Sequence, residues 1–303
     1  MKRKAKYLKK NYQLWLMLFP AVIYVFIFCY IPMYGMQLAF REYSFLAGIT
    51  GGEFVGMKYF NQYFSSPMFL TTLKNTFVIS AVSIIVGFPA PIILAMMINQ
   101  IRNKKWKRTV QTTVYIPYFI SVVVLVSMLN IMLANDSGVV GNFLKSIHLA
   151  AENTNLLGSE KAFVPVYVLS GVWQSMGWNS IIYIAALSSV DTQLYDACRI
   201  DGANKWQTMW NIDFPAILPT VIILLIMNMG HILAVGFDKI YLMQNSLNLE
   251  ASQVISTYVY SVGIKSSQFS FGAAVGLFNN IINFLFLLVT NHIAKRTTGN
   301  GLL

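Results

Sequence analysis

Six long stretches of this chain contain no charged residue, and this feature constrains the fold more than any other. They cover residues 11–40, 75–101, 109–135, 162–190, 214–237 and 266–294. Each is longer than the ~20 residues that a helix needs to cross the hydrocarbon core of a bilayer. A spanning segment must satisfy its backbone hydrogen bonds internally, and these stretches lack the alternating pattern of barrel strands. The sequence therefore predicts an all-α integral membrane protein with six transmembrane helices.

The expected organisation is a single transmembrane domain over residues 1–303. Its helices are predicted at residues 12–40, 75–99, 110–134, 163–190, 215–237 and 270–293, with a cytoplasmic loop at 191–214. A shorter uncharged segment, residues 59–73, is polar and is expected to lie at the membrane surface. Hydrophobic side chains make up 56% of the chain and charged ones 11%. Charged residues provide about a quarter of an ordinary soluble domain, so that class is excluded.

The positions of the positive charges predict the orientation, because loops rich in lysine and arginine stay in the cytoplasm. With both termini inside, fifteen of the 22 lysines and arginines and four of the 11 acidic residues are cytoplasmic. The cytoplasmic side then carries the whole net charge of +11, and the outer side is neutral. Topology explains the basic character of the chain, so no nucleic-acid partner is expected.

Several further features are expected to be absent. The basic N-terminus and the apolar run after it are similar to a secretory signal, but the run exceeds the usual 7 to 15 residues, so a retained first helix is expected. Cys29 and Cys198 fall in different segments, which predicts no disulfide. His148, His231 and His292 are scattered, so neither a metal site nor a catalytic cluster is expected.

A polar insert between two apolar stretches, Tyr195 to Pro215, carries the most specific motif of the chain. It contains Asp201-Gly202-Ala203 and, further on, Ile212-Asp213-Phe214-Pro215. Glycine at 202 can bend the backbone between two short helices. Apolar side chains are expected on one helical face at Leu194, Ala197 and Cys198 and on another at Trp206, Met209 and Trp210.

This insert resembles the cytoplasmic coupling loop of ABC importer permeases, which reads roughly E-A-A, three residues, D-G-A, then a hydrophobic stretch ending in I-x-L-P. Asp196 stands in place of the usual Glu, Cys198 in place of the second Ala and Phe214 in place of the Leu. A plain alternative is a surface loop whose aromatic side chains only contact lipid headgroups. That alternative leaves the spacing of the two motifs unexplained.

Three other segments resemble the LplB-like carbohydrate-uptake branch of these permeases. They are Tyr30-Ile31-Pro32-Met33-Tyr34-Gly35, Phe88-Pro89-Ala90-Pro91-Ile92, and Gln111-Thr112 with Tyr115-Ile116-Pro117. With the insert, the similarity extends over nearly the whole chain. It implies the type I ABC importer fold, also called MetI-like, in the bacterial cytoplasmic membrane.

The resemblance also implies partners and a coupling site. The coupling residues would be Asp196, Ala197, Asp201, Gly202, Ala203 and Trp206, docked on an ATPase subunit. The partners would be a second, distinct permease, two ATPase subunits and an extracellular binding protein that delivers an oligosaccharide, with uronate-containing sugars among the expected substrates. The chain lacks the phosphate-binding loop G-x-x-x-x-G-K-[ST]. ATP and Mg²⁺ are therefore expected on the partner subunits, with no cofactor on this chain.

Polar side chains within the predicted helices are candidates for an uncharged sugar pathway. They are Trp173, Gln174, Trp178, Asn179, Asn228, His231, Asn279, Asn280 and Asn283. Each has an alternative role in helix packing, because such side chains also join membrane helices by hydrogen bonds. Packing is the favoured role for His231.

Two other classes of function stay open. A secondary transporter or channel would need no ATPase, but no charged residue interrupts the predicted helices, and ion-coupled carriers usually carry such charges. An integral-membrane enzyme would need clustered catalytic groups, which the sequence does not offer. The predicted function is therefore the permease subunit of an ATP-driven importer, with the uncoupled transporter as the alternative.

Overall fold

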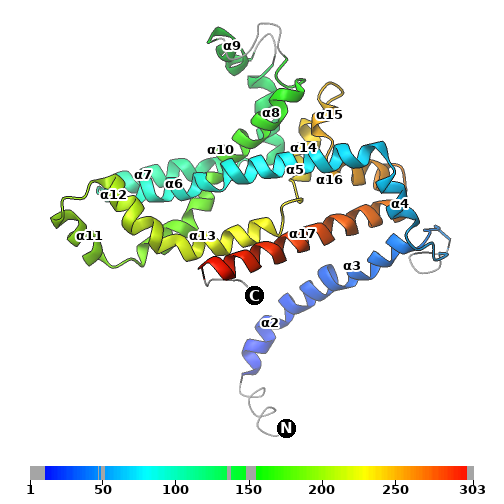
Figure 1. Cartoon of the computed structure of the whole chain (residues 1–303), viewed down its shortest axis with the longest axis horizontal. Coiled ribbons are helices and arrows are strands. Elements are labelled where there is room, and N and C mark those ends of the chain that lie inside the picture. The colour runs from blue at the N-terminus through cyan, green and yellow to red at the C-terminus, as the bar shows by residue number, and fades with distance from the viewer. Residues whose placement is uncertain (1–10, 47, 49–51, 135–137, 148–154, 299–303) are drawn as a thin grey trace. The chain divides into compact units, whose positions relative to one another are not determined.

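The computed structural model describes residues 11–46, 48, 52–134, 138–147 and 155–298, and the regular elements in these ranges are helical (Figure 1). Only two isolated β-bridges occur among these residues, Arg41 with Phe54 and Ser44 with Gly48. The all-α prediction is thus confirmed for the described part of the chain. The chain divides into two compact units: unit 1 is Met1–Ser66 with Val259–Phe278, and unit 2 is Pro67–Tyr258 with Asn279–Leu303.

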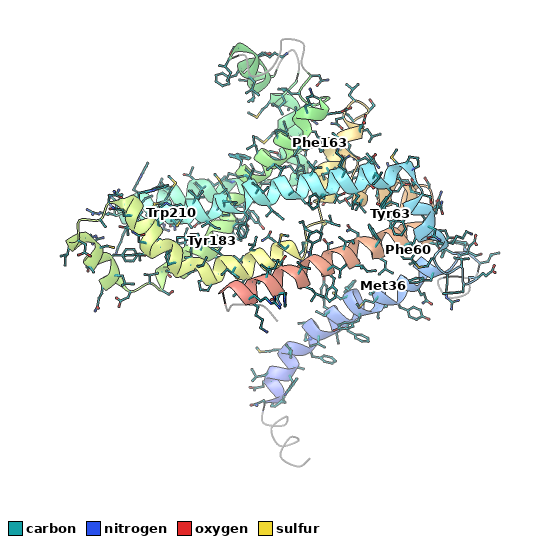
Figure 2. All side chains as sticks on the ribbon, viewed as in Figure 1. Met36, Phe60, Tyr63, Phe163, Tyr183 and Trp210 are labelled. Carbon is teal, nitrogen blue, oxygen red and sulfur yellow. The ribbon has the colours of Figure 1, made fainter. Side chains whose placement is uncertain are left out.

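Unit 1 begins with a helical run of 29 residues, Tyr12–Phe40. Its parts are α2 (Tyr12–Val25), a π-helical turn (Phe26–Tyr30), α3 (Ile31–Met33) and a 3₁₀ turn (Tyr34–Phe40). A small core joins the end of this run to α4 (Lys58–Phe64) and to the first turns of α17 (Phe269–Thr298). Its buried residues are Ala39, Phe60 and Ala274. Figure 2 labels Phe60 and, beside it on α4, Tyr63.

Helix α10 (Glu160–Ser188) is the centre of unit 2. It packs against α5 (Pro67–Gly87), α6 (Pro89–Asn99), α7 (Lys104–Tyr115), α13 (Phe214–Met229) and α15 (Leu249–Ser252). Two buried clusters lie along it, one around Tyr183 and one around Phe163 (Figure 2). Helix α10 thus contributes buried apolar side chains to both clusters of the unit.

The second apolar helix begins at Pro67, earlier than the predicted start at residue 75. It consists of α5 and α6 with only Phe88 between them, a span of 33 residues from Pro67 to Asn99. Pro89 occupies the first turn of α6, where a missing N–H costs no helical bond. The Phe88 N–H still donates to the Ile84 carbonyl at 3.0 Å. The segment at 59–73, expected at the membrane surface, is divided between α4 and the start of α5.

The third apolar helix is bent, whereas the sequence predicts one continuous span at 110–134. It begins at Lys104, capped by the Asn103 side chain, and passes through a 3₁₀ turn (Ile116–Phe119) into α8 (Val122–Met132) at an angle of 94°. The Ile120 carbonyl at the break accepts a hydrogen bond from Gln174 Nε2 at 2.7 Å. Irregular backbone in a membrane protein needs such a partner from the surrounding protein.

The fifth apolar helix is continuous with part of the predicted loop. Residues Lys205–Met229 form one helical run of 25 residues, comprising α12 (Lys205–Thr208), a π-helical turn (Met209–Asp213) and α13. The run ends at Met229 and not near residue 237. A short helix, α14 (Phe237–Met243), follows the turn.

Four described helices are long and apolar enough to cross a membrane by length and composition, and the bent pair makes a possible fifth. Helix α10 has 29 residues but is not among them. The described residues also form three short helices, α9 (Val139–Ser146), α11 (Thr192–Ile200) and α16 (Ile255–Val259). Six spans and cytoplasmic termini stay predictions.

We expect Gly177→Ala to destabilise unit 2, because a Cβ at this position of α10 would lie 1.9 Å from the Val114 carbonyl oxygen of α7. Small residues let membrane helices approach closely, and overpacking typically costs roughly 1–3 kcal/mol. The measurement is the melting temperature of the purified protein in detergent. Gly87→Ala is the matched control, since its Cβ would make an ordinary 3.6 Å contact with Val172. Equal melting temperatures for the two variants would contradict the close contact.

Candidate functional site

The Asp201-Gly202-Ala203 motif forms the turn between α11 and α12. The Gly202 N–H donates to the Arg199 carbonyl at 3.2 Å, and the Ala203 N–H donates to the Cys198 carbonyl at 2.9 Å. This pair of bonds is the Schellman motif that ends a helix, and it needs a left-handed residue, usually glycine. Gly202 has φ +75°, as required. The predicted bend between two short helices is therefore confirmed.

The next residue starts the second helix. Asn204 Oδ1 accepts from the Gln207 N–H at 2.9 Å, and Gln207 Oε1 accepts from the Asn204 N–H at 2.8 Å, which is a capping box. Four consecutive residues, 201 to 204, thus end α11 and begin α12 by local bonds alone. Both helices lie together at one end of unit 2 (Figure 1).

Asp213 anchors this corner to the rest of unit 2. It is fully buried at the end of the π-helical turn. Its Oδ1 accepts from Tyr195 Oη at 2.7 Å and from Asn99 Nδ2 at 3.1 Å, and its Oδ2 accepts from Gln100 Nε2 at 2.7 Å. A buried carboxylate is tolerated when hydrogen bonds compensate for its lost hydration. One side chain therefore joins α11, the C-terminal end of α6 and the start of α13.

Tyr195 is suited to be a permanent donor in this network. Burial and the hydrogen bond to Asp213 raise the pKa of its hydroxyl well above the ordinary value. The hydroxyl consequently keeps its proton at every physiological pH. Lys107 Nζ adds a longer contact of 3.4 Å to Asn99 Oδ1, which connects α7 to the same group.

The coupling residues predicted from the sequence lie on the outside of this corner. Asp196, Ala197, Asp201, Gly202 and Trp206 are exposed and Ala203 is half-buried. Large apolar side chains are exposed beside them, with Ile200 at 87% and Trp206 at 62%. A cavity of about 420 Å³ lies between α11 and the end of α6 and includes Asp196 and Ala203 in its lining. The corner offers a partner an apolar surface with acidic groups nearby, while docking itself stays a prediction.

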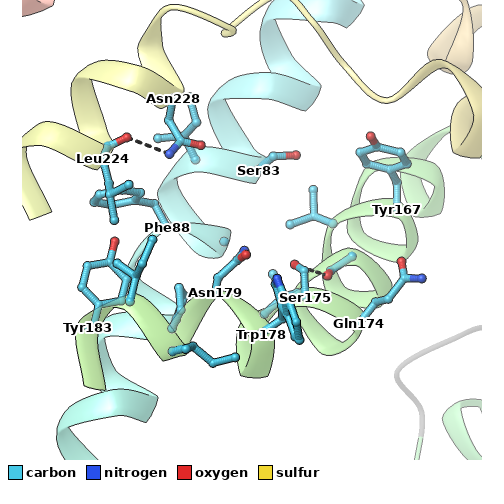
Figure 3. Close-up of a pocket in the computed structure, with 18 of the residues that line it drawn as sticks. Ser83, Phe88, Tyr167, Gln174, Ser175, Trp178, Asn179, Tyr183, Leu224 and Asn228 are labelled. Atoms are coloured by element: carbon cyan, nitrogen blue, oxygen red, sulfur yellow. Dashed lines mark hydrogen bonds between the residues drawn. The ribbon is translucent and has the colours of Figure 1, made fainter. Parts of the chain in front are cut away.

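A second, larger cavity of about 710 Å³ lies alongside α10 (Figure 3). It is lined from α5, α6, α10, α13 and α14. Four of the side chains predicted for a sugar pathway line it: Gln174, Trp178, Asn179 and Asn228. The structure thus brings residues from two separate helices to one space.

These four side chains differ in the hydrogen bonds and ring contacts that they already make within the protein. Gln174 donates to the bend at Ile120, and Asn228 Nδ2 donates to the Leu224 carbonyl within its own helix at 2.8 Å. The side chain of Asn179 makes no hydrogen bond with the described residues. The Trp178 ring stacks on Tyr118 with centroids 4.5 Å apart and planes 4° apart. The stacking fixes the orientation of an indole that borders the cavity.

The other candidates do not line this cavity. They are Trp173, His231, Asn279, Asn280 and Asn283. His231 lies in the turn after α13 and not on a helix as expected, because α13 ends at Met229. Asn283 is buried, and its Oδ1 accepts from the Leu233 N–H at 2.8 Å, which is a packing contact.

Among the lining residues that the sequence did not indicate, one is charged, Lys239 on α14. It was expected outside the membrane, but its side chain is buried, with 8% of the residue exposed, and it lines the cavity. Its Nζ donates to the Tyr167 carbonyl at 2.8 Å and lies 4.8 Å from the centre of that residue's ring. The sequence signal for the burial of Lys239 is the apolar residues around it in Phe237-Asp238-Lys239-Ile240-Tyr241.

The described residues hold two buried charges that the expectation of uncharged helices did not include. Asp213 falls inside the helical run Lys205–Met229, and Lys239 lies against α10. Asp213 sits at the loop end of its run, among neutral donors. No group of three His, Cys, Asp or Glu residues that could hold a metal ion occurs in the described part of the chain.

Comparisons with known proteins agree with this architecture. Residues 87–299 match the family described as the binding-protein-dependent transport system inner membrane component. The chain is 39% identical over 297 residues to the polygalacturonan/rhamnogalacturonan transport system permease protein YteP of Bacillus subtilis, covering 98% of this chain and 92% of that protein. It is 38% identical over 295 residues to protein LplB of the same organism, covering 97% and 92%.

Solved structures give the same result. A crystal structure of a bacterial ABC transporter involved in the import of the acidic polysaccharide alginate contains a similar chain, with a TM-score of 0.87 and 37% identity. The match covers 98% of this chain and 99% of that one. An alginate transporter in complex with an alginate pentasaccharide-bound periplasmic protein matches equally well. The chain therefore belongs to the binding-protein-dependent transport system inner membrane components, the permease subunits of ABC importers.

Proposed function

We propose that this chain is one permease of an ATP-driven importer that moves an oligosaccharide, of a class that includes uronate-containing sugars, across the cytoplasmic membrane. Its partners are a second homologous permease, two ATPase subunits that bind ATP and Mg²⁺, and an extracellular binding protein that delivers the sugar. Six helices span the membrane, and both termini are cytoplasmic. The names of the relatives motivate the substrate class.

The observation that carries this proposal is the anchoring of an exposed corner by Asp213. The α11–α12 corner has no phosphate-binding loop and exposes apolar side chains, so it suits a surface that receives force from a partner. Motion of α11 reaches α6 through Tyr195, Asp213 and Asn99. Motion of α12 reaches α13 through an unbroken helix. Both receiving helices line the cavity beside α10.

The polar composition of α10 fits a sixth span that borders the sugar path. Gln174, Asn179 and Trp178 lie on its cavity side. A sugar offers hydroxyl groups together with apolar C–H faces, and a ligand site typically combines apolar and aromatic walls with a few polar groups. A helix that lines such a site needs less apolar surface than one surrounded by lipid. This explains why α10 is not among the helices that are apolar enough to cross a membrane by composition alone.

The alternative function is a secondary transporter or channel without an ATPase. The two buried charges, Asp213 and Lys239, are features that a carrier could use. Asp213, however, makes its hydrogen bonds to groups at the corner and lines neither cavity. Its position therefore favours a mechanical role over one in an ion path.

The first experiment is purification of the tagged chain from its native membranes, with identification of the proteins that accompany it. The complex is then reconstituted into liposomes, and ATP hydrolysis and sugar uptake are measured with and without the loaded binding protein. We expect an ATPase and a second permease in the complex, and uptake that requires ATP. Uptake driven by an ion gradient in the absence of ATP would support the alternative instead.

Gly202→Val should uncouple the corner from the ATPase. Position 202 has φ +75° and no atom within 4 Å of an added Cβ, so the cost is backbone strain alone. The left-handed conformation costs an ordinary residue about 1–2 kcal/mol, equivalent to roughly a tenfold change in an equilibrium. We expect the binding-protein stimulation of ATPase activity to fall about tenfold. Gly202→Asn is the matched control and should retain most of it, because asparagine tolerates this conformation. Equal losses would assign the effect to side-chain bulk at the docking surface.

Asp213→Ala should reduce the number of sugars moved per ATP and also lower the melting temperature. The change removes the acceptor shared by Tyr195, Asn99 and Gln100. An unpaired buried donor costs roughly 1–3 kcal/mol, and these donors are half-buried, so we expect a loss near the lower end of that range. Uptake and ATP hydrolysis measured in parallel give the ratio. Asp196→Ala is the stability control, since its ion pair with Arg199 is exposed and such pairs contribute only about 0–1 kcal/mol. An unchanged ratio in Asp213→Ala would argue against transmission through this carboxylate.

Two tryptophans of α10 provide an internal comparison for the sugar path. Trp173 and Trp178 are similarly exposed, at 43% and 40%, but only Trp178 lines the cavity. We expect Trp178→Ala to reduce uptake by about tenfold and Trp173→Ala to leave it within about twofold, since a well-placed aromatic contact contributes roughly 0.5–1.5 kcal/mol beyond its buried area. The reverse order would place the path on the other side of α10.

A further inference from the structure

Lys239 is a buried cation, and no acidic side chain is found among the described residues that line its cavity. Among the described lining residues it alone has a charged side chain. No ion pair joins it to a described carboxylate, and the adjacent Asp238 is exposed. Lysine is almost never fully buried unless it is paired. The protein therefore keeps a positive charge at this position although no carboxylate among the described residues forms an ion pair with it.

The contacts of Lys239 hold the ammonium group in place without using all of its capacity. One N–H donates to the Tyr167 carbonyl at 2.8 Å, and the ring of the same residue lies 4.8 Å away. An ammonium group has three donors, so two stay available for a ligand. Burial lowers the pKa of Lys239 to about 8, which leaves the group mainly protonated at neutral pH.

Helix α10 leaves room for this ammonium. A Cβ on Gly171 would lie 3.2 Å from Lys239 Nζ, so the group occupies the space beside a glycine. Gly171, Tyr167 and Lys239 all line the cavity that also contains Trp178 and Asn179. The charge consequently faces the same space as the aromatic and amide groups suited to a sugar.

We propose that Lys239 binds the carboxylate of an anionic sugar inside the permease, so that this chain itself discriminates acidic from neutral oligosaccharides. The proposal rests on the proposed function and extends it to one residue. An arriving carboxylate supplies the missing counter-charge, and the two free donors of the ammonium bind its oxygens. A neutral sugar of the same size leaves the buried charge unpaired and gains no such contact.

The sequence offers one objection to an acidic substrate. Its outer loops sum to zero charge in the predicted topology, which offers no positive vestibule. A single buried cation removes that objection, because a charge acts more strongly in a site of low dielectric constant than at a solvated surface. Recognition at this point would also be less sensitive to salt than surface attraction.

The test uses the complete complex in liposomes and two matched probes, a galacturonic acid pentasaccharide and its carboxyl-reduced, neutral counterpart. Lys239→Met removes the charge and keeps much of the volume, and Lys239→Arg keeps the charge. We expect Lys239→Met to lower uptake of the acidic probe at least tenfold and uptake of the neutral probe by less than twofold. Lys239→Arg should restore a substantial part of the acidic uptake. Equal losses for both probes, or no loss for either, would overturn the proposal.

A binding measurement keeps the test decisive if the binding protein delivers only one of the probes. The purified complex, held with a non-hydrolysable ATP analogue and without binding protein, is titrated with each pentasaccharide by calorimetry. The wild-type complex should prefer the acidic probe about tenfold or more, and Lys239→Met should abolish this preference. Gly171→Ala, which displaces the ammonium but retains its charge, should reduce it. A preference that persists in Lys239→Met would assign selectivity to other groups.

The outcomes separate this proposal from the proposed function. If the wild-type complex neither hydrolyses ATP on addition of loaded binding protein nor imports either sugar, the importer function itself fails. If the wild-type complex imports sugar and Lys239→Met imports both probes at the wild-type rate, only the role of Lys239 fails. The melting temperature of each variant is measured in parallel, and a fall in Lys239→Met that lowers the two activities together would indicate a purely structural residue.

Discussion

The Asp213 carboxylate is the interaction on which the arrangement of the candidate site depends. It is the one point where α11, the end of α6 and the start of α13 meet through hydrogen bonds in the described structure. The three donors are neutral side chains, and a hydrogen bond from a neutral donor to a carboxylate is charge-assisted, which makes it stronger than a bond between two neutral groups. Asp213 itself is fully buried, so its carboxylate depends on these three half-buried donors in place of water. The corner and the helices behind it are therefore expected to move together.

A second constraint is the close approach of helices around α10. Gly177 lets the α7 backbone contact α10, and Gly171 leaves space for the ammonium of Lys239. In a bilayer, helices gain little from burying apolar side chains against each other, so close packing and polar contacts decide their association. The cavity lies where α10 carries polar side chains among apolar ones. Helix α10, against which several helices of unit 2 pack, therefore also forms much of the cavity wall.

Several parts of the site were predictable because they depend on local bonds. The Asp201-Gly202-Ala203-Asn204 sequence contains both the end of one helix and the start of the next, and its geometry needs no distant partner. The exposure of Trp206 agrees with its place in a polar insert. In contrast, the bend after Phe119 depends on Gln174, more than fifty residues further along the chain, and it was expected as a straight helix. His231 was assigned to a helix because the uncharged stretch continues beyond Met229, although the helix does not.

The all-helical membrane class, the placement of most apolar helices and the turn at Gly202 could be predicted from the sequence, since each depends on composition or on bonds between near neighbours. The folded chain sets which polar side chains share a cavity, because four candidates from α10 and α13 line it and five others do not. It also decided the roles of the two buried charges. Asp213 and Lys239 look like ordinary loop charges in the sequence, and only packing against distant helices removes them from water and gives them partners.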